Sequence, residues 1–202
     1  MKKRTLSSIG LATAVVASLI GAGAPVYAST TDVEAAPEST CSINYETQKT
    51  FCVEGDIEDL TAQLLEQQDV ALVEADAQGR ADLASARADA SRDGDVQPLA
   101  NYVLGVAYDD ASYGGRTIVF NTSVSTTCST HSFSWDELSF AYWQGFGWAN
   151  VDDQISSVAP GPGCKMWLYV DSNRSGSVYK ATGNAASLGW MNNQASSIWF
   201  TG

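Results

Sequence analysis

The chain reads Tyr108-Asp-Asp-Ala-Ser-Tyr-Gly-Gly115 and, 61 residues later, Tyr169-Val-Asp-Ser-Asn-Arg-Ser-Gly176. Both stretches have an aromatic residue first, an aspartate third and a glycine eighth. A glycine allows positive φ or a close backbone approach, so each stretch is expected to form a folded hairpin. The sixth position differs, because Tyr113 can pack on Tyr108 as an aromatic corner, whereas Arg174 must stack through its guanidinium.

A second repeated element, here called the closing motif, follows each hairpin stretch. The first closing motif is Asp152-Asp-Gln-Ile-Ser-Ser157 and the second is Asn192-Asn-Gln-Ala-Ser-Ser197. Each consists of a paired Asp or Asn, two further residues and Ser-Ser. The two copies occur in the same order relative to their hairpins, which indicates an internal repeat of two units.

Together these residues resemble the βγ-crystallin superfamily, over about residues 102–200. Its Greek-key units begin with an aromatic-x-Asp-x-x-aromatic-x-Gly hairpin, and its microbial calcium-binding members end each unit with Asn/Asp-Asn/Asp-x-x-Ser/Thr-Ser. The likeness extends to small secreted bacterial inhibitors of metalloproteinases. The resemblance implies an all-β sandwich of two Greek-key motifs that binds Ca²⁺.

The resemblance also implies which residues would provide oxygen ligands, of which calcium takes six to eight. Side-chain oxygens would come from the second residue of each pair and from the hydroxyl at the fifth position. The residue after the pair would offer its carbonyl, and a backbone carbonyl of the partner unit's hairpin would complete each site. The expected metal residues are Asp152, Asp153, Gln154 and Ser156 in the first motif, and Asn192, Asn193, Gln194 and Ser196 in the second.

The two expected sites differ in charge. The pair Asp152-Asp153 supplies anionic oxygens, whereas Asn192-Asn193 supplies only neutral amides. Because ligand charge tunes calcium affinity, the first site is expected to bind more tightly. The alternative is that both motifs are purely structural, since Asn, Asp and Ser also form turns by bonding to their own backbone. The last serine of each motif is expected to tie its hairpin to the sheet.

The composition changes near Pro98. Residues 101–202 hold all six tryptophans and 7 acidic residues, whereas residues 29–100 hold 16 acidic residues and only two aromatic residues. Short β-type runs separated by turn residues are expected at 102–108, 117–120, 165–170, 177–180 and 197–200. We therefore expect a signal peptide at 1–28, an acidic segment at 29–100 and the βγ-crystallin-like domain at 101–202.

The acidic segment is expected to be partly helical. Residues 40–53 read as a hairpin-like loop between two cysteines, after which Asp56 can cap a helix with Ile57, Leu60 and Leu64 on one face. Alanine-rich sequence continues to Ala90, with a break at Gly79 and a stop at Gly94. The helix is interpreted as an arm docked on the second half or as a pro-segment, with a disordered linker over 79–97 as the alternative.

The first residues indicate export. Met1-Lys-Lys-Arg4 is followed by an apolar run from Leu6 to Ala24 and by small residues that fit cleavage after Ala28. Cleavage leaves eight Lys and Arg against 23 Asp and Glu, a net charge of about −15. Because nucleic acids and anionic membranes bind basic faces, neither is expected as a partner. No other segment is long and apolar enough to span a membrane.

The four cysteines of an exported chain predict two disulfides. Three pairings are possible, and Cys41–Cys52 with Cys128–Cys164 is favoured because each pair then lies within one compositional region. The second disulfide would brace a loop, since the first unit has about 21 extra residues around Thr122 to Gly145. That loop could contact a protein or a sugar, or its aromatic side chains could fill the core.

No enzymatic motif accompanies the repeat. His131 is the single histidine, and the chain has neither a nucleophile elbow nor a zinc-protease helix. The expected function is therefore that of a secreted, non-enzymatic calcium-binding protein. The alternatives are a secreted (metallo)proteinase inhibitor that uses the disulfide-braced loop, and a protein that contacts a component of the cell envelope.

Overall fold

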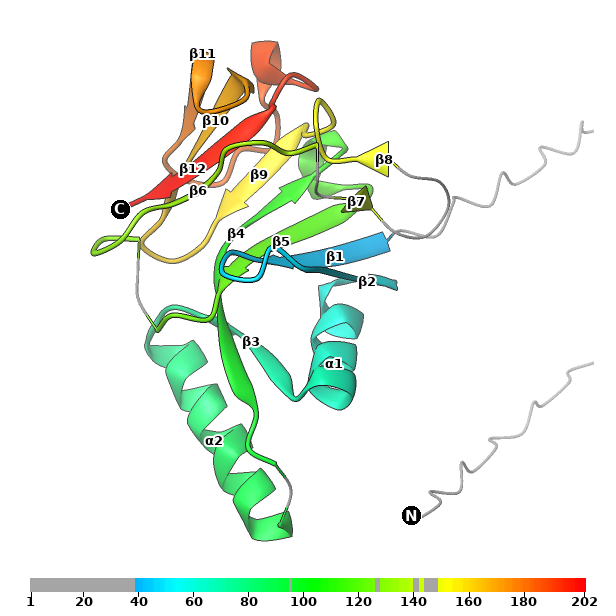
Figure 1. Cartoon of the computed structure of the whole chain (residues 1–202), viewed down its shortest axis with the longest axis vertical. Helices are drawn as coiled ribbons and strands as arrows, with labels where there is room; N and C mark the ends of the chain where they lie inside the picture. The colour runs from blue at the N-terminus through cyan, green and yellow to red at the C-terminus, as the bar shows by residue number, and fades with distance from the viewer. Residues whose placement is uncertain (1–38, 95, 126–127, 140–141, 144–148) are drawn as a thin grey trace, which may run out of the picture. The chain divides into compact units, whose positions relative to one another are not determined.

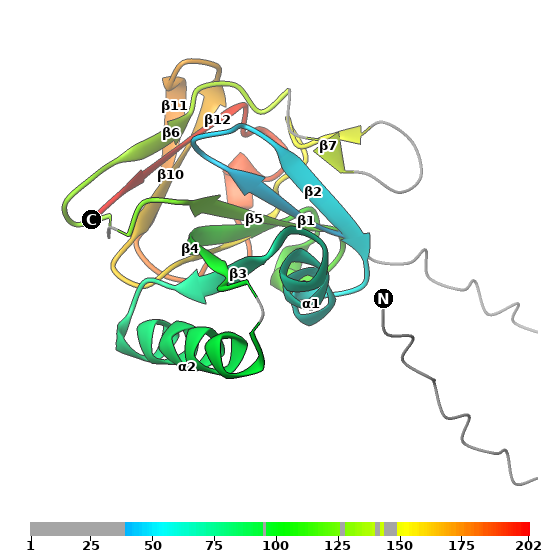
Figure 2. The ribbon, with the colours of Figure 1, turned by 60° about the horizontal axis from the view of Figure 1, so that its bottom comes forward.

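The structure is a computed structural model that describes residues 39–202 apart from 95, 126–127, 140–141 and 144–148. The expected signal peptide at 1–28 lies outside these residues. The described residues form three layers, which are a pair of helices, a six-stranded sheet and a four-stranded sheet (Figure 2). Within them, no helix is long and apolar enough to cross a membrane.

The six-stranded sheet is built around the hairpin of the first repeat. Its strands are β1 (Ser39–Asn44), β2 (Thr50–Glu54), β3 (Val70–Glu74), β4 (Leu99–Tyr108), β5 (Thr117–Thr122) and β9 (Ser157–Pro160). β4 and β5 are antiparallel, and β9 pairs with the second half of β4. β3 pairs in parallel with the first half of β4, and β1 pairs in parallel with β5 and antiparallel with β2.

The four-stranded sheet is built around the hairpin of the second repeat, in the order β11-β10-β12-β6 (Figure 1). Its strands are β6 (Phe133–Trp135), β10 (Lys165–Asp171), β11 (Ser175–Ala181) and β12 (Ser197–Thr201). A separate two-stranded ribbon consists of β7 (Tyr142–Trp143) and β8 (Ala149–Asn150). The five β-type runs expected from the sequence therefore correspond to β4, β5, β10, β11 and β12.

The two repeats exchange a segment, which makes them Greek keys. In sequence β6 lies between β5 and β9, yet it pairs with β12 of the second repeat. In return, Ala185 of the second repeat forms a bridge with Val158 in β9 of the first. Each repeat thus completes the other's sheet. The structure has the two-motif Greek-key sandwich that the sequence predicts.

The main core lies between the two sheets. Its largest fully buried side chains include Trp135, Phe120, Phe200, Ile43 and Leu104. Trp135 contacts Phe120 and Phe200, with ring centroids 4.9 and 5.6 Å apart. The core aromatic residues of β6 belong to the enlarged first unit, so part of that insertion fills the core, as one of the two interpretations expected.

The helical layer covers the other face of the six-stranded sheet. Helix α1 (Ile57–Gln68) begins at a capping box made by Asp56 and Asp59, which satisfies backbone N–H groups that the first turn leaves unpaired. Leu60 and Leu64 of α1 are buried against residues of β2, β4 and β5. Ile57, at the start of the same helix, is 36% exposed.

A second helix, α2 (Ala77–Asp93), occupies the region where an interrupted helix or a linker was expected. Asp76 caps its start, and Gly94, at φ +75°, ends it. Gly79 does not break the helix. A Cβ at Gly79 would lie 2.2 Å from the carbonyl oxygen of Glu74, so glycine allows the first turn to pack directly on β3.

Residues 39–98 are structurally continuous with the second half. The expected boundary near residue 100 falls inside β4, and β3, α2 and β4 form a crossover between two parallel strands. Strands on both sides of the boundary are joined in one sheet, so the acidic segment is neither a peripheral arm nor a linker. The hairpin expected at 40–53 corresponds to β1 and β2, whereas β3 and the parallel pairings were missed because parallel partners lie far apart in sequence.

The N-terminal hairpin is closed by a disulfide and is held on β6 and β5 by side-chain contacts. The Cys41–Cys52 disulfide, which the sequence favoured, joins paired residues of β1 and β2. Tyr45 packs edge-on against Phe133, with ring centroids 5.2 Å apart. The carboxylate of Glu46 accepts hydrogen bonds from the Thr122 hydroxyl and the Ser123 backbone N–H. The hairpin is therefore part of the core assembly.

Glu46→Gln is expected to destabilise the protein by about 1 kcal/mol at neutral pH, allowing for solvent screening. Burial alone would raise the pKa of Glu46, but the bonds from Thr122 and Ser123 outweigh it and lower this pKa. A lowered pKa stabilises the folded state above the unfolded-state value, and this contribution is lost as the pH falls through the folded value. Urea denaturation at pH 7 and pH 3 should therefore show a difference that fades in acid. Glu66→Gln, an exposed change on α1, should cost nothing; equal losses would contradict the prediction.

Candidate metal centre

The closing motifs face each other through their backbones. Asp153 and Asn193, the second residues of the two pairs, both have φ of 55°, a left-handed conformation in which Asp and Asn are favoured. The N–H of Asp153 donates to the carbonyl of Ala195 at 3.1 Å, and the N–H of Asn193 donates to that of Ile155 at 2.9 Å. The two loops are therefore related by a pseudo-twofold axis.

Side-chain oxygens meet across this axis. The Ser156 hydroxyl donates to Asn193 Oδ1 at 2.9 Å, and the Ser196 hydroxyl bonds to the Asp153 carboxylate. We call Asp153 with Ser196 the first site and Asn193 with Ser156 the second site. Each site thus combines the pair of one motif with the serine of the other. The sequence could not show this exchange, because the residue patterns of the two motifs are nearly the same.

Each site lies beside one hairpin. The backbone N–H of Ser196 donates to the carbonyl of Tyr169, and that of Ser156 donates to the carbonyl of Tyr108, both at 2.8 Å. The first site therefore lies next to the hairpin that begins at Tyr169, which belongs to the partner unit of Asp153. This is the arrangement expected for a shared site.

The last serines tie the hairpins to the sheets, as expected. Ser157 Oγ donates to the carbonyl of Asp110 at 2.6 Å and accepts from the N–H of Tyr113 at 3.1 Å. Ser197 makes the same two bonds, to Asp171 and from Arg174, at 2.7 and 3.0 Å. These two serines are structural and are not available as ligands.

The sixth hairpin position shows how the two units differ. Tyr113 packs edge-on against Tyr108, with ring centroids 5.6 Å apart. Arg174 instead lies over Trp199, 5.9 Å from the ring centroid, and forms an ion pair of 3.0 Å with Asp136. The guanidinium stacks as expected, but the ion pair with Asp136 was missed, since no motif marks that residue.

Electrostatics separate the two sites. Asp152 Oδ1 is buried and has no hydrogen-bond partner among the described residues. Burial, followed by the charge of Asp152, raises the pKa of Asp153, although the bond from Ser196 acts in the opposite direction. The unpartnered oxygen of Asp152 and the raised pKa of Asp153 both indicate that the negative charge of the first site is not balanced by the protein. A bound cation would balance this charge. Asn192, Asn193 and Gln194 of the second site are uncharged and exposed.

The described donor set suits calcium better than a transition metal. Among the described residues, no group of three or more His, Cys, Asp or Glu side chains is placed to hold a metal ion. The oxygens that converge are carboxylate, amide, hydroxyl and carbonyl, which are the ligands of hard cations. The side-chain N–H groups of Gln154 and Gln194 donate to the backbone carbonyls of Asp153 and Trp190.

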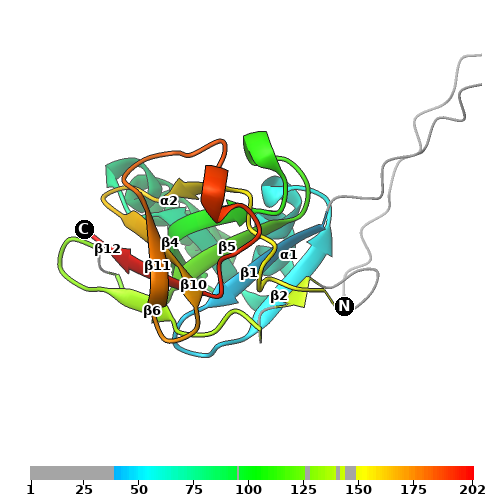
Figure 3. The ribbon, with the colours of Figure 1, turned by 90° about the horizontal axis from the view of Figure 1, so that it is seen from above.

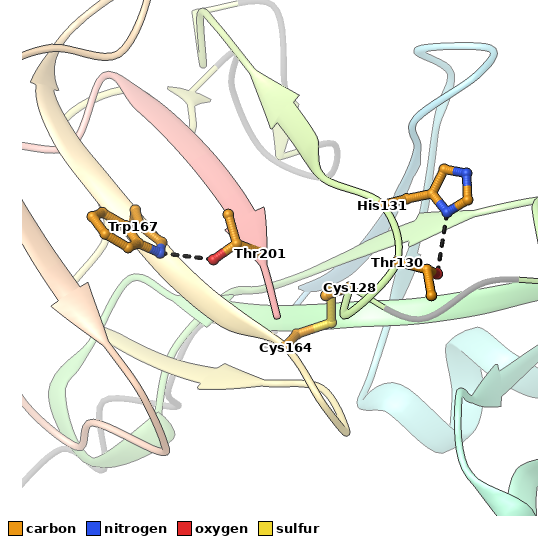
Figure 4. Close-up of a disulfide and its surroundings, with 6 residues drawn as sticks. All are labelled: Cys128, Thr130, His131, Cys164, Trp167 and Thr201. Atoms are coloured by element: carbon orange, nitrogen blue, oxygen red, sulfur yellow. Dashed lines mark hydrogen bonds between the residues drawn. A yellow bond between two sulfur atoms is a disulfide. The ribbon is translucent and has the colours of Figure 1, made fainter.

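The enlargement of the first unit is divided into two insertions. Trp135 and Ala185, equivalent by their bridges, lie 27 and 16 residues after Tyr108 and Tyr169. The first insertion contains Cys128, which is bonded to Cys164 as the sequence favoured (Figure 4). The second follows Leu138, contains β7 and β8, and lies partly outside the described residues, as do the side chains of Tyr142 and Trp143.

The first hairpin contacts the second unit at one end of the molecule. The short helix η1 (Ala111–Tyr113) lies in that hairpin, and η2 (Gly189–Met191) directly precedes the second closing motif. The N–H of Ser112 donates to the carbonyl of Ala186 at 2.7 Å, which places η1 beside the segment that leads to η2 (Figure 3). Trp190 of η2 is 53% exposed.

Similar solved structures are the N-terminal domain of Protein S and βγ-crystallin domains. The N-terminal domain of Protein S is 22% identical and matches 50% of this chain and 93% of its own, with a TM-score of 0.36. A βγ-crystallin domain from Clostridium beijerinckii is 16% identical over 48% of this chain and 97% of its own, with a TM-score of 0.35. One from Flavobacterium johnsoniae is 22% identical over 48% and 92%, with a TM-score of 0.34.

No protein-family model and no curated protein matches the chain. The assignment of the fold rests on this chain's own geometry, namely the exchanged strands and the serine bonds that close both hairpins. By these features the sandwich of residues 99–201 is βγ-crystallin-like, extended by the N-terminal strands and helices.

Proposed function

We propose that this protein is a secreted, non-enzymatic calcium-binding protein, with ions held between the two closing motifs. The observation that carries the proposal is the exchange of side-chain oxygens: Asp153 meets Ser196, and Asn193 meets Ser156. A structural turn needs only local bonds, whereas these oxygens converge from two repeats beside a hairpin carbonyl. The uncompensated carboxylate of Asp152 adds charge at the first site.

Secretion is supported by the sequence and by the disulfides. The basic head and apolar run of residues 1–28 are typical of an export signal, and both cysteine pairs are oxidised. No feature of the described residues favours the alternative of a proteinase inhibitor, since its loop, braced by Cys128, is only partly described.

Calcium is expected to raise the melting temperature of the protein by about 3 to 10 °C. Binding to the folded state alone stabilises it by about 2.7 kcal/mol when the free ligand is 100 times the Kd, and 1 kcal/mol corresponds to about 2 to 4 °C at this chain length. The measurement is a thermal melt in EDTA and in 10 mM calcium, since extracellular sites bind at roughly 10⁻⁴ to 10⁻³ M. An unchanged melting temperature would contradict the proposal.

Exchanging the charges of residues 153 and 193 should lower the calcium affinity of the first site and raise that of the second. Asp153→Asn is expected to weaken the first site by about tenfold, the equivalent of 1.4 kcal/mol, because it removes an anionic ligand. Without calcium the same variant should be slightly more stable, since its carboxylate is disfavoured by burial and by Asp152. Asn193→Asp should strengthen the second site. Titration calorimetry measures both affinities, with Asp82→Ala on α2 as a control that changes neither.

Tighter calcium binding in Asp153→Asn, or weaker binding in Asn193→Asp, would show that ligand charge does not determine which site has the higher calcium affinity. Equal calcium affinities in Asp153→Asn and the parent protein would show that the negative charge of Asp153 contributes nothing to binding. Both variants keep a residue that accepts the left-handed backbone at its position, so loss of binding would not arise from backbone strain.

A further inference from the structure

The outer face of the four-stranded sheet carries two adjacent tryptophans. Trp167 of β10 and Trp199 of β12 are paired in register, and their ring centroids are 5.4 Å apart. Successive side chains of a strand point to opposite faces, and the intervening Met166, Leu168, Ile198 and Phe200 are all in the core. The two tryptophans therefore lie on the side away from the core, together with Tyr169.

Polar contacts fix the orientation of these rings. The indole N–H of Trp167 donates to the Thr201 hydroxyl at 3.0 Å (Figure 4). Lys180 Nζ lies 4.0 Å from the ring centroid of Trp167, and the guanidinium of Arg174 lies 5.9 Å from that of Trp199. Lys180 lies over one face of the Trp167 ring and Arg174 over one face of the Trp199 ring, so a ligand carboxylate that pairs with Lys180 would draw this cation off the indole face on which a ring could stack.

Positive charge gathers on this face although the chain is strongly acidic. Residues 29–202 contain eight Lys and Arg, and Lys165, Arg174 and Lys180 are three of them. Arg174 is paired with Asp136, but no carboxylate of the described residues forms an ion pair with Lys165 or Lys180. Six of the acidic residues lie in α1 and α2, which are at the far end from β10 and β12 (Figure 1).

We propose that this face, formed by Trp167, Trp199, Tyr169, Lys165 and Lys180, binds an acidic polysaccharide. The C–H groups on the face of a sugar ring are weakly positive and pack on the electron-rich face of an indole. The carboxylates of uronic acid units would then pair with the ammonium groups of Lys165 and Lys180, which have no acidic partner among the described residues. The face places tryptophan rings next to lysine ammonium groups, and an acidic polysaccharide likewise carries a carboxylate on each sugar ring.

The size of the face favours a sugar chain over a folded protein. A stable protein interface uses about 20 to 30 residues on each side. Here the apolar surface is a few side chains on a sheet only four strands wide, at roughly 5 Å per strand. A single extended glycan chain crosses such a sheet and needs only a few ring stacks and ion pairs.

Titration calorimetry with three six-unit oligomers tests the proposal. The ligands are hexagalacturonate, neutral maltohexaose and hexaglutamate, each added to the full chain in EDTA, so that failure here is separate from failure of calcium binding. We expect saturable binding of hexagalacturonate that is at least about tenfold tighter than that of the other two. No saturable binding at millimolar hexagalacturonate would overturn the proposal, as would equal binding of hexaglutamate.

Variants then locate the binding surface. Trp167→Ala and Lys180→Gln should each weaken hexagalacturonate binding by about tenfold or more, as expected for a ring and a cation in direct contact. The matched controls are Trp190→Ala, which removes an exposed tryptophan elsewhere, and Lys49→Gln in the β1–β2 turn. Melting curves check that each variant is folded. Equal weakening by the controls, or none by Lys180→Gln, would overturn the proposal.

Discussion

A fragment of residues 101–202 is expected to remain unfolded, although it contains both repeats and the whole region that resembles a βγ-crystallin. Without residues 39–98, β5 loses its pairing with β1, and β4 loses β3. Ile43 and Cys41 disappear from the main core, and Val103 and Val119 lose Leu60 and Leu64 as cover. Each large core side chain contributes about 1.5 to 3 kcal/mol, so the loss of Ile43, Leu60 and Leu64 alone removes about 4.5 to 9 kcal/mol, which is comparable to the whole stability of about 5 to 15 kcal/mol of an ordinary domain.

The comparison is between this fragment and residues 29–202, both followed by circular dichroism and by thermal melting. The longer chain should melt in one cooperative transition, and the fragment should show none, with or without calcium. A cooperative transition in the fragment would mean that the N-terminal strands are dispensable, and that residues 101–202 are an independent domain after all.

Trp135→Ala is expected to destabilise the folded state by about 3 to 5 kcal/mol, the usual cost of truncating a large buried aromatic side chain. Trp135 is 1% exposed and touches Tyr45, Phe120 and Phe200, which come from three different parts of the chain. The cavity would therefore open where the N-terminal hairpin, the first repeat and the second repeat meet. Urea denaturation measures the change in the free energy of unfolding.

Trp135→Phe is the matched control. The indole N–H of Trp135 is buried without a hydrogen-bond partner among the described residues, so its removal recovers a desolvation cost of about 1 to 3 kcal/mol. This recovery offsets part of the lost packing, and the phenylalanine variant should stay within about 1.5 kcal/mol of the parent. Equal losses in the two variants would contradict this assignment of the cost to ring volume.

The features that sequence could predict are local ones. The hairpins depend on glycines and aromatic residues a few positions apart, and the helix that starts at Asp56 depends on a cap within one turn. The pairing of β1 with β5 and of β6 with β12 joins residues that are far apart in sequence. No local pattern encodes such pairing, so the N-terminal segment was expected to lie outside the sheet.

The candidate site was predictable residue by residue but not as an arrangement. The side chains of Asp153, Asn193, Ser156 and Ser196 do meet, yet across the pseudo-twofold axis. Because the two motifs are nearly identical, the sequence does not show whether each serine shares a site with the pair of its own motif or with that of the other motif. Asp136 was not singled out from the sequence, because its ion pair with Arg174 depends on the exchange of β6 between sheets.

The parallel pairing of β1 with β5 has a consequence for the timing of folding. The buried hydrogen bond between Ser42 and Asn121 joins residues 79 positions apart. β1 therefore pairs with β5 only after the intervening chain has been brought together. Contacts of such long range slow folding, because the entropy of closing the intervening loop is lost before they form. The Cys41–Cys52 pair, 11 residues apart, can close early. The disulfide would then hold β1 and β2 together as a hairpin until β5 is available for pairing.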